Sequence, residues 1–473
     1  MNQFDIKTLI ENRYGQNYEL HDKYVNRTLS KVLRTIGFDK VYKSAKGAYL
    51  YDEEGNAYLD FLSGYGVYGI GRNHPVVGKA IKDAIDMDLS NLVQLDCALL
   101  SGLLAEALVS LTGSRRDAVF FCNSGTEANE GAIKFARAHT KRPRMISLHG
   151  AYHGLTYGSL SLTVSKNFQE GYGPLIPGIG EVEYDNLEAL ENELKSKDVA
   201  GFIFEPVQGK GVYYPKDDYF VKAQELCKKY GTLFIADEVQ TGFGRTGKMF
   251  GYQHWDLDPD IVTVAKTLSG GYVPCAAFIT TREIHQSSFS SMEKCVVHST
   301  TFGRNNLAMV SGLATIDVLK SENLVEQANV MGEKLRAKIR TLQDKYDFIK
   351  EVRGLGLIIA IEFQEPKKLT TRLAWKSLKA ANQSLFIQMI VTMMMENHRI
   401  LTQIASHNID VLKILPPYVI TDKEIDLFVN ALDDTLSKVG NVASNLLSFG
   451  KRLLSAASEE KASKKKLASE KKE

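Results

Sequence analysis

The 473-residue chain is 44% hydrophobic and 24% charged, the composition of a globular protein, which excludes a disordered, collagen-like or disulfide-rich one. Its formal net charge of +2 is too small to indicate a nucleic-acid-binding protein. The segment from Lys451 to the end holds eight Lys or Arg and four Glu residues, so the basic character belongs to a tail and residues 1–450 are mildly acidic. At about 100–200 residues per domain, the length predicts at least two lobes.

The expected elements begin with a helical segment and a hairpin between residues 20 and 62. Two short strands, 49–51 and 57–59, flank the turn-rich residues 52–56. From about residue 75, short apolar runs alternate with longer helical patterns, which predicts a largely parallel sheet covered on both faces. The predicted strands are 118–121, 145–148, 202–204, 233–236, 261–264 and 276–279.

The C-terminal part is expected to be helical after about residue 310 and to return to a strand at 357–361. A last helix begins at Thr421, because Thr421 and Glu424 have the spacing of a capping box. Beyond residue 440, the Lys-, Ser- and Ala-rich sequence predicts a flexible tail.

The sequence also predicts the cellular setting. No run reaches the roughly 18 consecutive apolar residues that span a bilayer, and residues 1–7 lack a secretory leader pattern. The cysteines are far apart and form no C-x-x-C pair, which predicts reduced thiols; they are Cys97, Cys122, Cys227, Cys275 and Cys295. We therefore expect a cytoplasmic protein with no membrane partner.

Three turns that follow predicted strands carry side chains suited to chemistry. The turn at 123–127 opens a helix and offers backbone N–H groups to a phosphate, although most such turns are only helix caps. Asp237 follows the strand at 233–236 and is either a functional carboxylate or a solvated loop residue. Lys266 follows the strand at 261–264 and is either a buried nucleophilic amine or an exposed lysine.

Two other motifs are excluded. Residues 242–248 spell G-x-x-x-x-G-K, but a P-loop needs Ser or Thr next and the chain has Met249. His149 and His153 are four residues apart, but the neighbouring glycines argue against a metal-binding helix, so no metal site is predicted.

A phosphate site, a carboxylate and a nucleophilic lysine at one edge of a sheet are what pyridoxal phosphate (PLP) requires. The lysine holds the aldehyde as a Schiff base, and the carboxylate keeps the pyridine nitrogen protonated. With this combination the chain resembles the class III aminotransferases, over about residues 40–435. The matching stretches are 123–128 (NSGTEA), 152–154 (YHG), 204–209 (FEPVQG), 237–247 (DEVQTGFGRTG), 265–271 (AKTLSGG), 300–302 (TTF), 353–357 (RGLGL) and 416–417 (PP).

The resemblance implies an α/β fold, fold type I of the PLP-dependent transferases. In this fold, helices cover a mostly parallel seven-stranded sheet in a large domain, and a smaller α+β domain is built from both termini. The expected division is a small-domain segment 1–74, a PLP-binding domain 75–335, a C-terminal small domain 336–440 and a basic tail 441–473.

The resemblance also implies a role for each matching residue. Lys266 is expected to form the Schiff base and to move the proton in the 1,3-shift, and Asp237 to pair with the pyridinium nitrogen. Further cofactor contacts are expected at Ser124, Gly125 and Thr126 around the phosphate, at Tyr152 and Val239 on the two ring faces, at His153, at Gln240 near the phenolic oxygen, and at Thr301 across a homodimer interface. Substrate contacts are expected at Tyr68, Glu205 and Lys413.

Lys413 departs from the family pattern. It stands before Pro416-Pro417, where relatives that bind α-carboxylates have an arginine, and a lysine lacks the bidentate fork of arginine. Arg399 is either an alternative ligand for the carboxylate or, more often for such a residue, a solvated arginine. The departure favours a terminal amine, an ω-amino acid or an apolar aldehyde as one substrate, with a 2-oxo acid as the other.

The predicted function is PLP-dependent transamination between an amine, ω-amino or amino-acid donor and a 2-oxo acid or aldehyde acceptor, in a homodimer with shared active sites. A phospho-lyase or aminomutase on the same scaffold is one alternative, and a lyase would need no 2-oxo acid acceptor. A non-catalytic PLP-binding regulator is another, but residues 1–40 are too short for a winged helix and the lysine-rich tail has few arginine or aromatic side chains to read bases.

Overall fold

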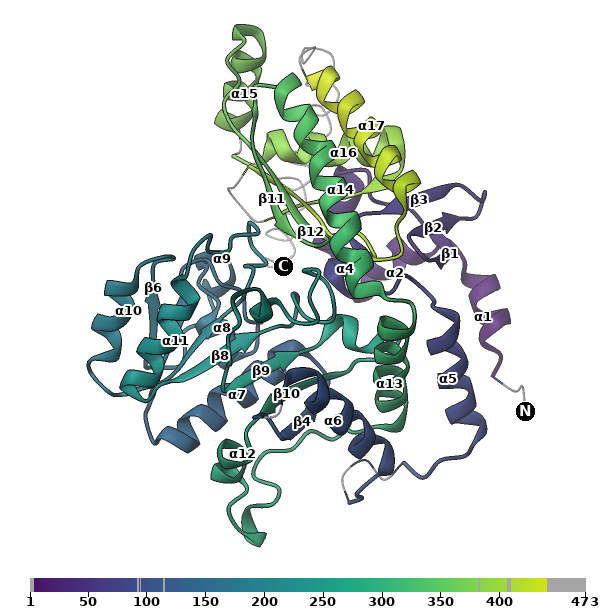
Figure 1. Ribbon diagram of the computed structural model, residues 1–473. Helices are drawn as coiled ribbons and strands as arrows, with labels where there is room; N and C mark the ends of the chain where they lie inside the picture. The colour runs from purple at the N-terminus through teal and green to yellow at the C-terminus, as the bar shows by residue number, and fades with distance from the viewer. Residues whose placement is uncertain are drawn as a thin grey trace, which may run out of the picture.

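The computed structural model describes residues 4–91, 93, 95–113, 115–381, 383–405 and 410–439. Its largest sheet has seven strands in the order β4-β10-β9-β8-β7-β5-β6 (Figure 1). Neighbouring strands from β9 to β6 pair in parallel, whereas β10 is antiparallel to both β9 and β4. The strands are β4 (Ala118–Cys122), β5 (Arg144–Leu148), β6 (Ile179–Val182), β7 (Val199–Phe204), β8 (Leu233–Asp237), β9 (Ile261–Val264) and β10 (Ala276–Thr280).

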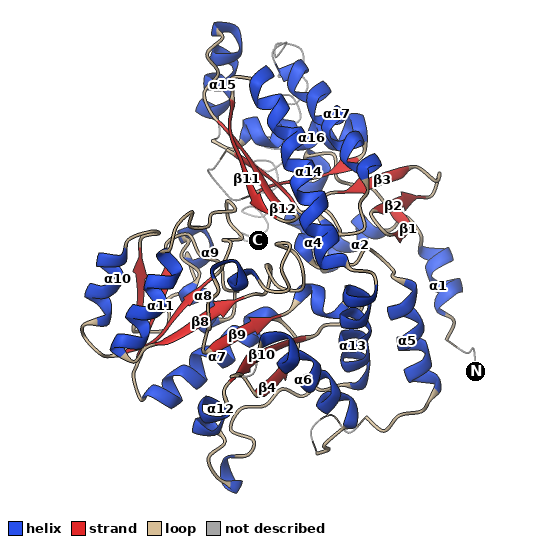
Figure 2. Cartoon of the chain, viewed as in Figure 1, coloured by secondary structure: helices blue, strands red, loops and turns tan. Residues whose placement is uncertain are grey.

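Helices cover both faces of this sheet, as expected for strands that are apolar throughout (Figure 2). In β8, Phe234 and Ala236 pack in the same cluster as side chains of helices α6 (Leu99–Thr112) and α11 (Tyr219–Tyr230). The alternate residues, Leu233 and Ile235, pack in a second cluster with helix α7 (Gly125–Thr140). The predicted doubly covered α/β sheet is confirmed.

The six predicted strands of this sheet are all present, but β6 was missed. This strand lies at the edge of the sheet, and of its four residues, Ile179-Gly180-Glu181-Val182, only Val182 is buried. An edge strand with one buried side chain produces no apolar run, so the pattern that identified the other strands is absent here.

A second, four-stranded antiparallel sheet lies in the C-terminal part, in the order β11-β12-β15-β14. The predicted strand at 357–361 is confirmed as part of β12. Helices α14 and α16 pack against this sheet, and α17 packs against both helices. The elements are β11 (Ile349–Leu355), β12 (Ile358–Phe363), β14 (Gln403–Ile404), β15 (Val411–Ile414), α14 (Leu324–Lys345), α15 (Leu369–Ala381), α16 (Leu385–His398) and α17 (Asp422–Val439).

A third sheet joins the N-terminal and C-terminal parts of the chain. The predicted hairpin is formed by β2 (Tyr49–Asp52) and β3 (Ala57–Asp60), with β1 (Tyr42–Lys46) beside β2. The short strand β13 (Ile400–Leu401) pairs in parallel with β3. Segments more than 300 residues apart in sequence are therefore hydrogen-bonded, and they place the start of the chain against its C-terminal lobe.

The predicted start of the last helix is confirmed. The Glu424 carboxylate accepts hydrogen bonds from Thr421 N (2.9 Å) and Thr421 Oγ1 (2.6 Å), just before α17. No helix of the described part is long and apolar enough to cross a bilayer. The predicted tail, 441–473, lies outside the described residues. The remaining helices are α1 (Ile6–Arg13), α2 (Asn17–Tyr24), α3 (Arg27–Thr35), α4 (Ser63–Gly66), α5 (Pro75–Asp86), α8 (Tyr157–Leu162), α9 (Lys166–Gln169), α10 (Leu187–Leu194), α12 (Arg282–Ser288) and α13 (Asn306–Ser321).

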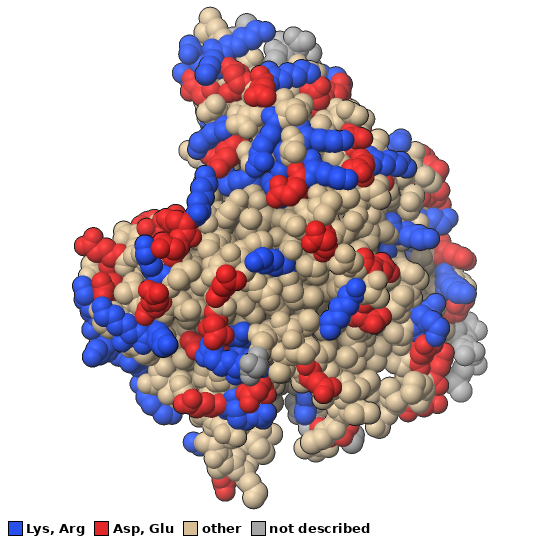
Figure 3. Space-filling model, in the orientation of Figure 1, with Lys and Arg blue, Asp and Glu red and all other residues tan. Residues whose placement is uncertain are grey.

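On the face seen in Figure 3, basic and acidic side chains are interspersed over the molecule. Helices α14 and α17 illustrate this, because three lysines of α14 pair with three aspartates of α17. The pairs are Lys334–Asp422, Lys338–Asp426 and Lys345–Asp433.

Candidate active site

The side chains expected to carry chemistry converge at the carboxyl edge of the large sheet. Asp237 is the last residue of β8, and Glu205 directly follows the neighbouring strand β7. Lys266 follows β9 on the other side of β8, and Tyr152 lies in the loop after β5. Because parallel strands end at one edge of the sheet, their four loops bring these side chains together.

Asp237 is held in a closed hydrogen-bond network. Its Oδ2 accepts a hydrogen bond from Asn129 Nδ2 (2.8 Å) and lies 2.8 Å from His153 Nδ1, while its Oδ1 accepts one from Val239 N (3.0 Å). Asp237, Asn129 and His153 are each at least 96% buried. Three hydrogen-bonding groups around a buried carboxylate fix its direction. Asp237 and His153, which are both predicted to contact the cofactor, therefore contact each other directly.

Lys266 lies in a strained position, and its side chain is half-buried. It has a φ of +46°, which is rare for a residue with a side chain, and begins a 3₁₀ segment, Lys266–Ser269. Next to it, Thr267 Oγ1 donates to Gly66 O at 2.9 Å, which anchors the segment. Burial lowers the pKa of the Lys266 ammonium, and the charges of Asp237 and Glu205 oppose this effect. A lowered pKa leaves more of the amine neutral and nucleophilic.

The turn that opens α7 has the geometry of an anion site. Ser124 caps the helix, with its Oγ accepting from Glu127 N (3.4 Å), and within the described residues no protein acceptor is recorded for the N–H groups of Gly125 and Thr126. Ser124 and Glu127 have the spacing of a capping box, but the box is only half formed, because the Glu127 carboxylate accepts from Asn123 N (2.7 Å) instead of Ser124 N. Free N–H groups at a helix N-terminus favour a phosphate.

Two glycines keep this turn open. A Cβ on Gly125 would lie 2.7 Å from Val239 Cγ1, and a Cβ on Gly154 would lie 2.4 Å from Thr126 Oγ1. Thr126 Oγ1 is also 2.6 Å from Thr156 Oγ1, so a second hydroxyl lies beside the turn. These close approaches place Val239 and Thr126 beside the turn that opens α7, and their contacts with a cofactor stay predictions.

On the substrate side, Glu205 and Lys413 are both buried but do not pair directly. Glu205 accepts hydrogen bonds from Tyr152 N (2.9 Å) and Gly209 N (2.8 Å), and burial raises the pKa of its carboxyl group. Lys413 Nζ donates to Gly209 O and to Gln240 Oε1, both at 2.6 Å. The Lys413 ammonium is therefore largely engaged by groups of the protein itself.

Gln240 is held at both ends of its amide. Its Oε1 accepts from Lys413, and its Nε2 donates to Tyr65 O at 3.0 Å. Among the described residues the second proton of Nε2 has no acceptor, and the contact of Gln240 with a cofactor oxygen stays a prediction.

Three other predicted residues lie outside this network, and the roles predicted for Tyr68 and Thr301 stay predictions. Tyr68 packs against Gly271 and under Arg72, whose guanidinium carbon is 3.9 Å from the ring centre. Thr301 is exposed at the surface, beside Phe302, which is 62% exposed. Arg399, the alternative carboxylate ligand, lines a different cavity formed with Asp52 and other residues of the N-terminal part, so that suggestion was wrong.

Sequence reasoning missed Asn129 and Lys210. Asn129 is one turn into α7, on the buried side of the helix with Ala128 and Ala132. An asparagine among small apolar residues on a buried helix face is a signal for a buried polar partner. Lys210 directly follows the matching stretch that ends at Gly209, so the family pattern assigns it no role.

The site fits pyridoxal phosphate. The buried Asp237 carboxylate suits a protonated ring nitrogen, and the helix terminus that begins at Gly125 suits the phosphate. Lys266 supplies the amine. Two buried polar atoms of the network, His153 Nε2 and Asn129 Oδ1, have no hydrogen-bond partner among the described residues, so the network retains capacity for a ligand or for water.

The chain is similar to known aminotransferases along most of its length. A family profile described as aminotransferase class III matches residues 35–436. Acetylornithine aminotransferase of Methanocaldococcus jannaschii is 37% identical, over 84% of this chain and 94% of that protein. Aminotransferase PigE of a Serratia strain is 32% identical over 87% of this chain, which spans about half (52%) of its length.

Solved structures of aminotransferases are also similar to this chain. Ornithine aminotransferase from Toxoplasma gondii superposes with a TM-score of 0.80 and 28% identity, over 93% of this chain and 99% of that one. A PLP-bound amine transaminase from an uncultivated Pseudomonas species gives a TM-score of 0.75 at 28% identity, over 84% and 94%. The chain belongs to the class III aminotransferases, a family of pyridoxal phosphate-dependent enzymes.

Proposed function

We propose that this protein transfers an amino group between an amine, ω-amino or amino-acid donor and a 2-oxo acid or aldehyde acceptor. The observation that carries the proposal is the buried Asp237 network next to the half-buried Lys266 amine and the open N-terminus of α7. The names of its relatives, ornithine and acetylornithine aminotransferases and an amine transaminase, support donors with an amine at the end of a carbon chain.

The roles of the residues follow from their surroundings. When bound, PLP supplies an electron-accepting ring that stabilises negative charge on the donor carbon. Asp237 keeps a proton on the ring nitrogen, since its buried carboxylate favours a cationic neighbour. Lys266 Nζ would hold the cofactor covalently at rest and would move a proton on and off the donor carbon, which its lowered pKa makes easier. The N–H groups of Gly125 and Thr126 bind the phosphate.

Two further parts of the proposal concern the assembly and the domains. We propose a homodimer in which Thr301 reaches the partner's site. Exposed apolar side chains support it: Phe302 next to Thr301, Leu95 just before α6 and Leu99 at the start of α6. The division 1–74, 75–335 and 336–440 is supported by the pairing of β3 with β13. The five cysteines are free, which supports a reducing, cytoplasmic setting.

A half-reaction screen tests the proposed activity. The PLP-loaded protein is mixed with single amines, ω-amino acids and α-amino acids, with no acceptor present, and the visible absorption of the cofactor is followed. We expect rapid loss of this absorption with terminal amines or ω-amino acids, and its recovery when a 2-oxo acid is added. Loss with α-amino acids alone would contradict the expected donor class, and no loss with any amine would contradict the activity.

A further inference from the structure

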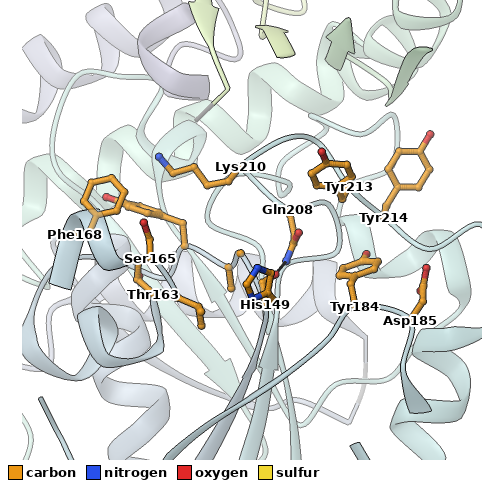
Figure 4. A pocket seen from close by; sticks show the side chains of 14 residues that line it. His149, Thr163, Ser165, Phe168, Tyr184, Asp185, Gln208, Lys210, Tyr213 and Tyr214 are labelled. Carbon is orange, nitrogen blue, oxygen red and sulfur yellow. Dashed lines mark hydrogen bonds between the residues drawn. The ribbon is translucent and has the colours of Figure 1, made fainter. Parts of the chain in front are cut away.

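A cavity of about 440 Å³ adjoins the cofactor site at Tyr152. It opens among the loops that follow β5, β6 and β7 (Figure 4). Its walls are rich in aromatic side chains, namely Tyr152, Phe168, Tyr184, Tyr213 and Tyr214. None of the roles proposed so far uses this space, and its shape suits the carbon chain of a ligand more than a water-filled channel.

Lys210 is the cation of this cavity. Its Nζ lies 4.9 Å from the ring centre of Tyr152 and 4.8 Å from that of Phe168, and these two rings meet edge to face. Within the part of the chain that the structure describes, this ammonium makes no hydrogen bond and no ion pair. The nearest carboxylate that influences it is Glu205, whose two oxygens already accept from backbone N–H groups. A half-buried ammonium without an acceptor favours an anionic ligand.

The loop that carries Lys210 is fixed in place. Gln208 N donates to Tyr213 O (2.8 Å) and Gln208 Nε2 to His149 O (2.8 Å), which closes the loop against the end of β5. Arg353 donates from Nη2 to Gly211 O at 2.7 Å. Because the backbone on both sides of Lys210 is held, the lysine can offer its charge to a ligand without a large loss of entropy on binding.

Lys210 and Lys413 differ in the number of hydrogen-bond donors that each has free for a ligand. Lys413 Nζ donates hydrogen bonds to Gly209 O and Gln240 Oε1, and Lys413 does not line this cavity. Lys210 lines the cavity and, within the described part of the chain, retains all three N–H donors of its ammonium. Resting on the proposed function, we propose that Lys210 binds the carboxylate of the amino-acid or oxo-acid substrate, whose carbon chain lies against the aromatic walls.

The arrangement favours a ligand with one carboxylate. Lys210 extends over one side of the cavity toward Phe168, and Asp185 lies at the opposite side (Figure 4). A second carboxylate on the ligand would approach Asp185 and be repelled. One lysine among aromatic rings also offers too few donors for a phosphate dianion. The substrate class is therefore a monocarboxylate with an apolar chain, such as an ω-amino acid and its oxo-acid counterpart.

Binding of a non-reacting pair of ligands tests this role without relying on turnover. Hexanoate and hexanamide have the same chain, and only hexanoate is charged. Their affinities are measured by calorimetry on the PLP-loaded protein and on Lys210→Met, which keeps the length of the side chain, and Lys210→Arg, which keeps the charge. Lys216→Met is the matched control, because Lys216 is a largely exposed lysine six residues away (82% exposed).

We expect Lys210→Met to weaken hexanoate binding by about 10- to 100-fold, the range for a lost charged hydrogen bond, and to leave hexanamide binding unchanged. Lys210→Arg and Lys216→Met should bind hexanoate nearly as the unaltered protein does. Three results would overturn the proposal: no hexanoate binding by the unaltered protein, unchanged hexanoate binding by Lys210→Met, or an equal loss for hexanamide.

A kinetic arm separates this proposal from the proposed function. The ω-amino derivative of hexanoate should show a KM raised by a similar factor in Lys210→Met, while the KM for hexylamine, which has no carboxylate, stays constant. If the unaltered protein transfers nitrogen but Lys210→Met keeps its hexanoate affinity, only the role of Lys210 fails. If Lys210→Met loses hexanoate binding while no amine reacts with the unaltered protein, the role of Lys210 holds as a binding site and the transaminase function fails.

Discussion

The two sides of the site differ in how completely their charges are satisfied. On the cofactor side, the Asp237 carboxylate has three hydrogen-bond donors within 3.0 Å and is nearly inaccessible to solvent. On the substrate side, Lys210 faces an open cavity with no acceptor of its own among the described residues. Binding of one constant cofactor allows a closed network, whereas a substrate must enter and leave, so its binding groups remain unpaired until it arrives.

The largest effect is expected on the cofactor side, at Lys266. Lys266→Ala removes the group that moves the proton, so kcat should fall by about 10²- to 10⁴-fold, the usual contribution of a positioned acid–base group. The variant should also lack the visible absorption of the lysine-linked cofactor. Steady-state kinetics and absorption spectra of the purified variant check both.

Lys266→Arg is the comparison for this variant. An arginine keeps a cation at this position but does not give up its proton at neutral pH, so it should be almost as inactive as alanine. Normal transamination by either variant would show that Lys266 is not the proton-transferring group.

The next effect is expected at Asp237. Asp237→Asn keeps the shape and the acceptor for Val239 N, but removes the charge that holds a proton on the ring nitrogen. We expect kcat, measured by steady-state kinetics, to fall by about 10²- to 10³-fold, as for the loss of one preorganised electrostatic contact.

Glu238→Gln is the matched control for Asp237→Asn, because Glu238 is the adjacent buried carboxylate. Its partners are Thr241 Oγ1, Gly251 N and Tyr252 N, on the side away from the cofactor network. The folded Glu238→Gln protein should retain its kcat, and an equal loss in both variants would argue against a specific role for Asp237.

A smaller effect is expected at Asn129, which positions Asp237 and the backbone of His153. Asn129→Ala removes a hydrogen bond to the buried Asp237 carboxylate and another to His153 O, so both kcat and the affinity for PLP should fall by about tenfold. Kinetics and equilibrium titration of the cofactor-free protein with PLP measure the two quantities. Unchanged values would mean that His153 and Val239 N are sufficient to position the carboxylate.

The smallest effect concerns the substrate side and the pH dependence of stability. Burial lowers the pKa of Lys413 well below its usual range, while in the unfolded chain it returns to about 10.4. Between the two pKa values the unfolded chain binds a proton that the folded protein lacks, so the free energy of unfolding rises with pH. Lys413→Met removes this contribution and should flatten the rise by up to about 1.4 kcal/mol per pH unit.

Urea unfolding of the cofactor-free protein at several pH values below about 10 measures this slope. Lys216→Met, which removes an exposed lysine, should run parallel to the unaltered protein. If Lys413→Met also runs parallel, the buried lysine does not change its protonation on folding.

The sequence predicted correctly that Asp237 and Lys266 stand at the ends of strands, because both follow clear apolar runs. Asp237 ends a strand of five buried residues, and Lys266 follows one of four, so the apolar runs alone point to both. The edge strand β6 produces no such run and was missed. Asn129 was missed because its role depends on a contact with Asp237, 108 residues away in sequence.

The substrate side was predicted less well because it depends on packing between loops. Lys413 was expected to contact the substrate because it stands before Pro416-Pro417, yet its Nζ donates to Gly209 O and Gln240 Oε1. The position of Lys210 depends on its contacts with the rings of Tyr152 and Phe168, which come from another loop and a short helix. Neither fact is visible in the spacing of residues along the chain.

Transfer of labelled nitrogen tests the central claim most directly. The PLP-loaded protein is supplied with a ¹⁵N-labelled terminal amine or ω-amino acid and an unlabelled 2-oxo acid, and the products are analysed by mass spectrometry. The account predicts that the label appears in the amino acid formed from the 2-oxo acid, and that product formation stops after one turnover when the 2-oxo acid is left out. Continued turnover without any 2-oxo acid, with the label released as ammonia, would contradict it and favour a lyase.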